Sequence, residues 1–276
     1  MSTFREILMT ARDYLKRHEI ADADVDAWYL LAHVFRISRA DFYLRCDDEV
    51  LDSQVEIYKQ FVRQRAKHIP LQHITGTQEF MGLEFEVTSD VLIPRQDTEI
   101  LVEEVLKVCN QKSVLDMCTG SGCIIISLAK LGNITKAVGV DLSDKALAVA
   151  IKNAAKHQLN VEFIQSNLFD NIDGVFDIVV SNPPYIPTEE IQNLMPEVRD
   201  HEPFMALDGD RDGLTFYRRI ASEVKDHLSQ NGYLFFEIGY NQGQEVREIL
   251  EKAGFTDIKI VKDLSGLDRV VFGRRD

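Results

Sequence analysis

The chain has 276 residues, and its 31 lysines and arginines against 45 aspartates and glutamates leave a formal net charge of −14 at pH 7. Hydrophobic residues make up 45% and charged residues 28%, a mixture typical of globular rather than disordered chains. Acidic residues outnumber basic ones both before and after residue 92, which argues against a surface built to neutralise nucleic-acid phosphates. No apolar run approaches the roughly 20 residues of a membrane span, and the N-terminus lacks a signal-peptide core, so we expect a cytoplasmic protein.

The cysteines give no indication of a metal site or of a disulfide framework. Cys46, Cys109, Cys118 and Cys123 form no C-x-x-C pair, and the seven histidines are scattered along the chain. We therefore predict free thiols in a reducing compartment and no bound metal.

The first 70 residues have the pattern of a small helical domain. Thr3 with Glu6, and Ser53 with Glu56, form capping-box patterns that would each begin a helix. A short helix is expected near residues 41–45. A second helix is predicted to carry Val25, Trp28, Tyr29, Ala32 and Phe35. Because this region carries no chemical motif, we expect residues 1–70 to form a recognition domain.

Pro70 is predicted to end the helical region. Residues 72–88 alternate polar and apolar side chains around a turn at Met81 and Gly82, which is typical of a β-hairpin. We interpret residues 71–92 as a hairpin linker.

From residue 93 onward, strand and helix patterns alternate. Helices are predicted at residues 98–108, 123–131, 143–157, 214–228 and 243–253. Strands are predicted at residues 113–117, 137–140, 161–165, 176–181, 233–238, 256–263 and 268–274. This alternation indicates an α/β fold with a parallel sheet and helices on both faces, and the last two strands should pair antiparallel at one edge. Residues 93–276 are thus predicted to be a catalytic domain.

A glycine-containing loop joins the first of these strands directly to a helix. It reads Asp116-Met-Cys-Thr-Gly-Ser-Gly122, and glycines at such a turn let the backbone approach a ligand at the carboxyl end of the sheet. A dinucleotide fingerprint would need a third glycine at Ile125, and a phosphate loop would need Gly-Lys-Ser/Thr. The next strand ends in Asp141, which is well placed to accept hydrogen bonds from ribose hydroxyls. The alternative is a purely structural tight turn.

The strand at residues 176–181 runs into Asn182-Pro183-Pro184-Tyr185. Consecutive prolines cannot continue a ladder, so this segment is predicted to be a rigid loop at the same edge of the sheet. The Asn182 side chain and the Pro183 carbonyl can accept both hydrogens of a planar NH2 group, and the Tyr185 ring can pack against it. Such an arrangement suits methyl transfer to a delocalised nitrogen, for which positioning matters more than a strong base.

The glycine loop resembles that of class I S-adenosylmethionine-dependent methyltransferases, although Cys118 stands where the first glycine usually lies. The N-P-P-Y motif resembles that of enzymes that methylate planar nitrogens. Together with residues 74–87, 92–99, 203–214 and 236–242, these motifs resemble the PrmC (HemK) family of N5-glutamine methyltransferases, which act on bacterial class-1 peptide release factors.

The resemblance implies a Rossmann-like, seven-stranded class I methyltransferase fold, S-adenosylmethionine as cofactor and the glutamine of a Gly-Gly-Gln tripeptide as substrate. It implies catalytic roles for Asn182, Pro183 and Tyr185 and substrate contacts by these three and Pro184. The implied cofactor-binding residues are Cys118, Thr119, Gly120, Ser121, Gly122, Asp141, Leu142, Asn167, Leu168 and Asn182. Asn167 and Leu168 stand where the family often has aspartate and an aromatic residue beside the adenine.

Some assignments stay open at this stage. Residues 95–99 either line the cofactor side or form a structural cap at Asp97, while Glu237 and Gln242 are expected to shape the site rather than act in catalysis. The rival activity is an adenine N6-methyltransferase acting on DNA or RNA, which would need a basic recognition region. A non-catalytic binding module is a second alternative. We expect a monomer that binds a release factor and makes no direct contact with nucleic acid or membrane.

Overall fold

The computed structural model describes residues 2–276, which divide into two compact units. The first unit takes the chain up to Gly76 together with Met195–His201, and the second comprises Thr77–Leu194 and Glu202–Asp276. The break after Gly76 falls inside the predicted linker at residues 71–92. Nothing in the sequence pattern indicates that Met195–His201 returns to the first unit. No helix within residues 2–276 is both long and apolar enough to cross a membrane.

The first unit is helical. Its elements are α1 (Phe4–Arg17), α2 (Ala23–Phe35), α3 (Arg39–Arg45), α4 (Asp52–Arg65), α5 (Leu71–Thr75) and α9 (Pro196–Arg199). The capping box at the start of α1 is confirmed, because the Thr3 hydroxyl accepts from the Glu6 backbone at 3.3 Å and the Glu6 carboxylate accepts from the Thr3 backbone at 2.9 Å.

One prediction for the helical unit is wrong. The helix α4 begins at Asp52, so Ser53 already lies in its first turn and makes no capping bond. The second predicted helix is confirmed as α2, which buries Ala23, Ala27, Trp28 and Leu30–Leu31 and leaves Val25 and Tyr29 about half exposed.

Met195–His201 is tied to the helices through a buried arginine. The Arg65 guanidinium lies 2.6 Å from the Asp26 carboxylate and 2.9 Å from that of Glu197, and its side chain is only 8% exposed. A buried arginine needs such partners because an unpaired charge is costly away from water. This pair of contacts therefore explains why α9 groups with the first unit.

The hairpin is shorter than predicted. Residues 71–75 form α5 instead of a strand, because Pro70 is well suited to precede a helix and Gly76, at φ 77°, ends it. The strands β1 (Thr77–Phe80) and β2 (Leu83–Glu86) pair antiparallel around Met81 and Gly82. Both turn residues have positive φ, as a two-residue hairpin turn requires, so the predicted turn is confirmed.

The second unit is built on a seven-stranded sheet in the order β5-β4-β3-β6-β7-β9-β8. Its strands are β3 (Ser113–Met117), β4 (Lys136–Asp141), β5 (Glu162–Gln165), β6 (Phe176–Ser181), β7 (Leu228–Glu237), β8 (Phe255–Lys262) and β9 (Asp268–Arg275). The first five pair parallel, while β9 pairs antiparallel with β7 and with β8 at the edge, as predicted. The strand β7 begins at Leu228, five residues before its predicted start.

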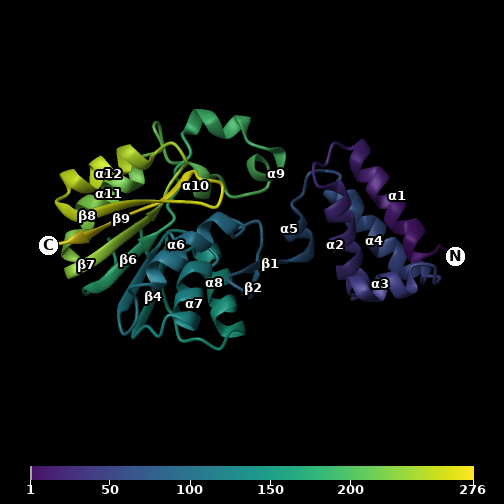
Figure 1. Cartoon of the computed structure of the whole chain (residues 1–276), viewed down its shortest axis with the longest axis horizontal. Helices are drawn as coiled ribbons and strands as arrows, with labels where there is room; N and C mark the ends of the chain where they lie inside the picture. The colour runs from purple at the N-terminus through teal and green to yellow at the C-terminus, as the bar shows by residue number, and fades with distance from the viewer. Residues whose placement is uncertain (1) are drawn as a thin grey trace. The chain divides into compact units, whose positions relative to one another are not determined.

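Helices cover both faces of this sheet (Figure 1). On one face lie α6 (Gln96–Leu106), α7 (Cys123–Leu131) and α8 (Asp144–Lys156); on the other lie α11 (Thr215–Glu223) and α12 (Gly243–Lys252). Shorter pieces are α10 (Phe204–Leu207) and the 3-10 helices η1 (Thr188–Asn193) and η2 (Val224–Asp226). The helix α6 begins at Gln96, so Asp97 is not its cap. Ser143 does cap α8, accepting from the Ala146 backbone at 3.2 Å.

Candidate functional site

A cavity of about 410 Å³ opens at the carboxyl ends of β3, β4 and β6, where a doubly wound sheet binds its ligands. Many of the predicted site residues line it: Cys118, Thr119, Gly120, Ser121, Asp141, Leu142, Asn182 and Pro184. Its lining, taken from residues 2–276, does not include Gly122, Asn167, Leu168, Pro183 or Tyr185. The structure thus brings the glycine loop and the proline-rich loop to one cavity.

The glycine loop has a conformation that ordinary side chains rarely adopt. Cys118, Gly120 and Gly122 all have positive φ, at 62°, 55° and 79°. A Cβ on Gly122 would lie 2.9 Å from Ile126 on α7 and 3.2 Å from Ala150 on α8, so glycine is required for the close helix packing. Gly122, although outside the cavity lining, therefore shapes the loop that lines it.

Asp141 ties this loop to the neighbouring strand. One carboxylate oxygen accepts from the Gly120 backbone and the other from the Ser143 backbone, each at 2.9 Å. Burial raises the pKa of Asp141, and the backbone donors oppose that rise. Each carboxylate oxygen has two lone pairs, so acceptor capacity remains toward the cavity. Asp141 can therefore hold the loop and still bind hydroxyl groups of a ligand.

Behind the loop, Asp116 is completely buried at the end of β3. It accepts a hydrogen bond of 2.6 Å from the Thr119 hydroxyl, and burial raises the pKa of Asp116 to about 7. Asn153 on α8 supports the same loop from the other side, donating to the Ser121 and Glu86 carbonyls at 3.0 Å. Asn153 thus links the glycine loop to the hairpin, which the sequence pattern did not reveal.

The proline-rich loop presents one polar side chain to the cavity. Asn182 lines the cavity, and its amide nitrogen donates to the Thr98 hydroxyl on α6 at 3.4 Å. That orientation leaves the Asn182 side-chain oxygen as an acceptor. Pro183 and Pro184 are buried and fix the backbone between Asn182 and Tyr185.

Two hydrogen bonds and close packing against two glycines hold Tyr185 in place. Its hydroxyl donates to Glu237 at 3.4 Å, and its carbonyl accepts from the Gln242 side chain at 3.0 Å. A Cβ on Gly209 would lie 2.7 Å from the Tyr185 Cα, and one on Gly213 would lie 2.3 Å from the Tyr185 carbonyl oxygen. Both glycines are therefore needed for close approach to Tyr185, which accounts for the glycines of the segment 203–214.

The opposite wall combines residues 90–98 with residues 203–208. Arg95 and Thr98 line the cavity, and Arg95 forms a 2.7 Å ion pair with the buried Glu202. Burial raises the pKa of Glu202, and the Arg95 charge opposes it. Phe204 and Met205 also line the cavity, and their side chains are 57% and 50% exposed. The segment 95–99 thus contributes to the wall, while its Glu99 accepts from the Met81 backbone and anchors the hairpin.

Asn167 and Leu168 lie away from the cavity wall. Asn167 donates to Asp170 at 3.1 Å and accepts from Arg219 at 3.3 Å. The Leu168 side chain is buried in the core between the sheet and α11. The cavity of this structure does not extend to either side chain, so their assignment to the cofactor stays a prediction.

Sequence reasoning missed Asn153 and Glu202, and within residues 95–99 it did not identify the role of Thr98. Each of the three is a buried polar residue whose partner is distant in the sequence: Ser121, Arg95 and Asn182, respectively. No spacing rule within a single helix or loop could have identified them. Among residues 2–276, no group of three or more His, Cys, Asp or Glu could hold a metal ion.

Comparisons with known proteins agree with this architecture. Residues 6–76 match the model of the PrmC N-terminal domain, and residues 95–198 match that of the methyltransferase small domain. A methyltransferase of solved structure from Pyrococcus furiosus superposes with a TM-score of 0.55 at 17% identity, covering 70% of this chain and 89% of that one. That likeness shows the fold alone; the matched methyltransferase small domain and the seven-stranded sheet confirm the predicted class I methyltransferase architecture.

Sequence relatives extend over nearly the whole chain. The release factor glutamine methyltransferase of Geobacter sulfurreducens is 42% identical over 274 residues, covering 99% of this chain and 96% of the relative. The enzyme of the same name from Agrobacterium fabrum is 39% identical, covering 97% of this chain and 96% of the relative. The resemblance drawn from the motifs is confirmed, and the chain belongs to the family of release factor glutamine methyltransferases.

Proposed function

We propose that this protein transfers a methyl group from S-adenosylmethionine to the side-chain amide nitrogen of the glutamine in the Gly-Gly-Gln motif of class-1 peptide release factors. The observation that carries the proposal is one cavity lined by both the glycine loop with Asp141 and the Asn182 side chain. A cofactor site and an amide-binding group thus share the same space. The names of the sequence relatives support the substrate.

The residues present fit this cofactor. Gly120 at positive φ leaves open space where a side chain would stand, so a ligand can approach the backbone. Asp141 retains acceptor capacity for the ribose hydroxyls, and Leu142 beside it lines the same wall. When bound, S-adenosylmethionine supplies an electrophilic methyl group on a positively charged sulfur and leaves as S-adenosylhomocysteine. Cys118–Gly122 and Asp141 are the residues that would hold it.

The proline-rich loop handles the substrate amide. A primary amide nitrogen is a poor nucleophile because its lone pair is delocalised, so its orientation decides the rate. The Asn182 side-chain oxygen and the Pro183 carbonyl accept the two N–H groups, and the Tyr185 ring packs against the amide plane. No strong base is required, because the proton becomes acidic as the new N–C bond forms and these same oxygens stabilise the charge.

The decisive experiment compares acceptors. The protein is incubated with labelled S-adenosylmethionine and either a class-1 release factor, the same factor with its Gly-Gly-Gln glutamine changed to alanine, or duplex DNA. We expect label in the intact factor and none in the other two. Label in DNA would support the adenine methyltransferase alternative, and equal label in the alanine factor would refute glutamine as the acceptor.

We further propose that residues 1–70 recognise the release factor, that residues 71–92 link them to a catalytic domain at residues 93–276, and that the protein works as a cytoplasmic monomer without direct nucleic-acid contact. Three residues supply too little contact area for specificity, so remote contacts must provide binding energy. Tyr43 and Leu44 on α3 are 72% and 84% exposed and offer such a contact.

This recognition role predicts a selective loss. Changing both Tyr43→Ser and Leu44→Ser should lower kcat/KM for the folded release factor about tenfold, since about 1.4 kcal/mol of contact energy corresponds to that factor. The same variant should methylate a short Gly-Gly-Gln peptide as well as the wild type does. Equal activity of both proteins on the folded factor would exclude α3 from recognition.

A further inference from the structure

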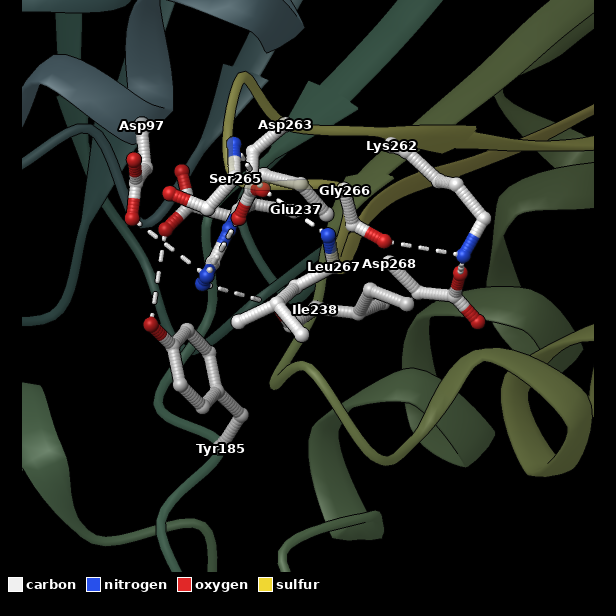
Figure 2. Close-up of polar contacts among 11 residues, drawn as sticks. Asp97, Tyr185, Glu237, Ile238, Lys262, Asp263, Ser265, Gly266, Leu267 and Asp268 are labelled. Atoms are coloured by element: carbon white, nitrogen blue, oxygen red, sulfur yellow. Dashed lines mark hydrogen bonds and ion pairs between the residues drawn. The ribbon is translucent and has the colours of Figure 1, made fainter.

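A polar cluster lies behind Tyr185, at the ends of β7 and β9 (Figure 2). The Tyr185 hydroxyl donates to Glu237, the last residue of β7. Beside it, Arg269 lies 3.3 Å from the Asp97 carboxylate and 3.1 Å from that of Asp263, and it also donates to the Ile238 carbonyl. Figure 2 shows the Tyr185 hydroxyl directed toward this cluster. Tyr185, to which the proposed function gives a substrate contact, is thus connected to charged groups outside the cavity.

Glu237 is the central member of this cluster. It is only 2% exposed, so its carboxyl group depends on protein partners rather than on water. Its Oε1 accepts the hydrogen bond from Tyr185, its Oε2 has no hydrogen-bond partner among the described residues, and Arg269 supplies a nearby positive charge. Thr98, whose hydroxyl accepts a hydrogen bond from the Asn182 side-chain nitrogen, lies close to the same carboxyl group. Of the two motif side chains, Tyr185 is thus the one that is bonded directly to this buried carboxyl group.

The surroundings of the Glu237 carboxyl group act on its pKa in opposite directions. Burial raises the pKa of Glu237 to about 7, and the nearby Thr98 hydroxyl, the Arg269 charge and the hydrogen bond from Tyr185 oppose that rise. The titratable groups that face it come from several elements: Asp97 on α6, Cys123 on α7, Tyr185, Tyr217 on α11 and Arg269 on β9.

From this geometry we infer, resting on the proposed function, that Glu237 is a positioning residue for methyl transfer. Acting through Tyr185, it holds the Tyr185 ring in the orientation that the substrate amide needs. It does not line the cavity within the described chain, so it exerts this effect without touching substrate or cofactor.

The ionised carboxylate is the form that performs this task. Ionised, it accepts the hydrogen bond from the Tyr185 hydroxyl with full strength; protonated, it becomes a donor at one oxygen and a weaker acceptor at the other. Because an acid is protonated below its pKa, kcat should fall as the pH drops through about 7. Replacing Glu237 by glutamine should remove this limb of the pH profile.

The test uses the full chain with Glu237→Gln, Tyr185→Phe and the double variant. Asp177→Asn serves as the control, because Asp177 binds Ser113 at the start of β3, away from the cavity. We expect Glu237→Gln to lower kcat roughly 2- to 10-fold, the scale of one hydrogen bond. The double variant should be no worse than the poorer single variant, because both remove the same contact. The affinity for S-adenosylhomocysteine, measured by calorimetry, should stay within twofold.

A second readout does not depend on turnover. With tyrosine labelled by carbon-13 at the ring carbon that bears the hydroxyl, the Tyr185 signal should shift with an apparent pKa near 7 in the wild type and not in Glu237→Gln. If Glu237→Gln does not fold, the inference is tested by the pH titration of the wild-type Tyr185 signal and by the kcat of Tyr185→Phe. A wild-type signal that is flat between pH 6 and 8, or a Glu237→Gln enzyme with unchanged kcat and pH profile, would overturn the inference.

The same experiment separates this inference from the proposed function. A wild-type protein that labels no release factor refutes the proposed function, and the inference as a statement about methyl transfer falls with it. A wild-type protein that labels the factor, with variants that do so equally well, refutes the inference alone.

Discussion

Two loops at the same edge of the sheet are supported in different ways. The glycine loop after β3 combines local bonds with distant ones: Thr119 donates to Asp116 three residues earlier and the Gly122 backbone donates to the Thr119 carbonyl, while Asp141 and Asn153 bind its Gly120 and Ser121 backbone groups. The proline-rich loop after β6 is held by residues 52 to 84 positions away, namely Thr98, Glu237 and Gln242. The first loop therefore has local bonds beside its distant partners, and the second depends on three separate elements.

The composition of the two loops explains this difference. Glycine and threonine supply backbone freedom and a hydroxyl that can close a turn locally. Two consecutive prolines remove two backbone N–H donors, so the second loop cannot build a hydrogen-bonded turn of its own. Its rigidity comes from the rings, and its orientation must come from outside. We therefore expect changes in the first loop to affect cofactor binding and changes around the second to affect turnover.

We expect Asn182→Ala to lower turnover more than any other variant. A smaller effect would contradict the division of roles between the two loops. Losing a polar contact made at the reacting centre should lower kcat by ~10²–10³, as for other transition-state contacts. The affinity for S-adenosylhomocysteine should change only a few-fold in calorimetry. The exposed Asn110→Ala is the control and should retain full activity. Near-normal turnover of Asn182→Ala would remove this residue from the mechanism.

Asp141→Ala should act on the other loop. Losing a charged acceptor costs roughly 1.5–3 kcal/mol, so we expect the cofactor Kd to rise about 10- to 100-fold, with a smaller change of kcat at saturating cofactor. The exposed Asp173→Ala provides the control for loss of an acidic side chain. If Kd is unchanged while kcat falls, the division between the two loops is wrong.

Gly213→Ala tests the close approach behind Tyr185. The new Cβ would overlap the Tyr185 carbonyl, which lies 2.3 Å from its position, and the backbone has φ +71°. Gly174→Ala is a matched control, because Gly174 also has positive φ but nothing within 4 Å of the Cβ position. We expect Gly213→Ala to lose about 1–3 kcal/mol more unfolding free energy than the control, measured by chemical denaturation. Equal losses would show that only backbone strain matters at this glycine.

Thr98→Val should have the smallest effect, because it removes one hydroxyl and keeps the shape of the side chain. One hydrogen bond is worth about 0.5–1.5 kcal/mol, so kcat should fall about 2- to 10-fold while the cofactor Kd stays unchanged. Thr98→Ser keeps the hydroxyl and should restore most of the activity. A valine variant as active as the serine variant would show that Thr98 supports the loop by packing alone.

Much of the fold could be read from local patterns. The alternation of strands and helices after residue 93 predicts the parallel sheet, and the closeness of the last two strands in the sequence predicts their antiparallel pairing. The capping box at Thr3 and the cap at Ser143 are confirmed. The failures have a common cause: at Ser53 and at residues 71–75, local propensity allowed more than one structure.

Local sequence also determined the conformation of the glycine loop, the rigidity of the Asn182–Tyr185 turn and the position of both at strand ends. These features depend on φ preferences, hydrophobic periodicity and caps, which act over a few residues. Only the tertiary structure decided that Thr98 meets Asn182, that Glu237 and Gln242 meet Tyr185, and that Arg65 binds Glu197. Those contacts join elements that are far apart in the chain. Their pairing follows from the order in which the strands assemble and from the need of buried polar groups for partners.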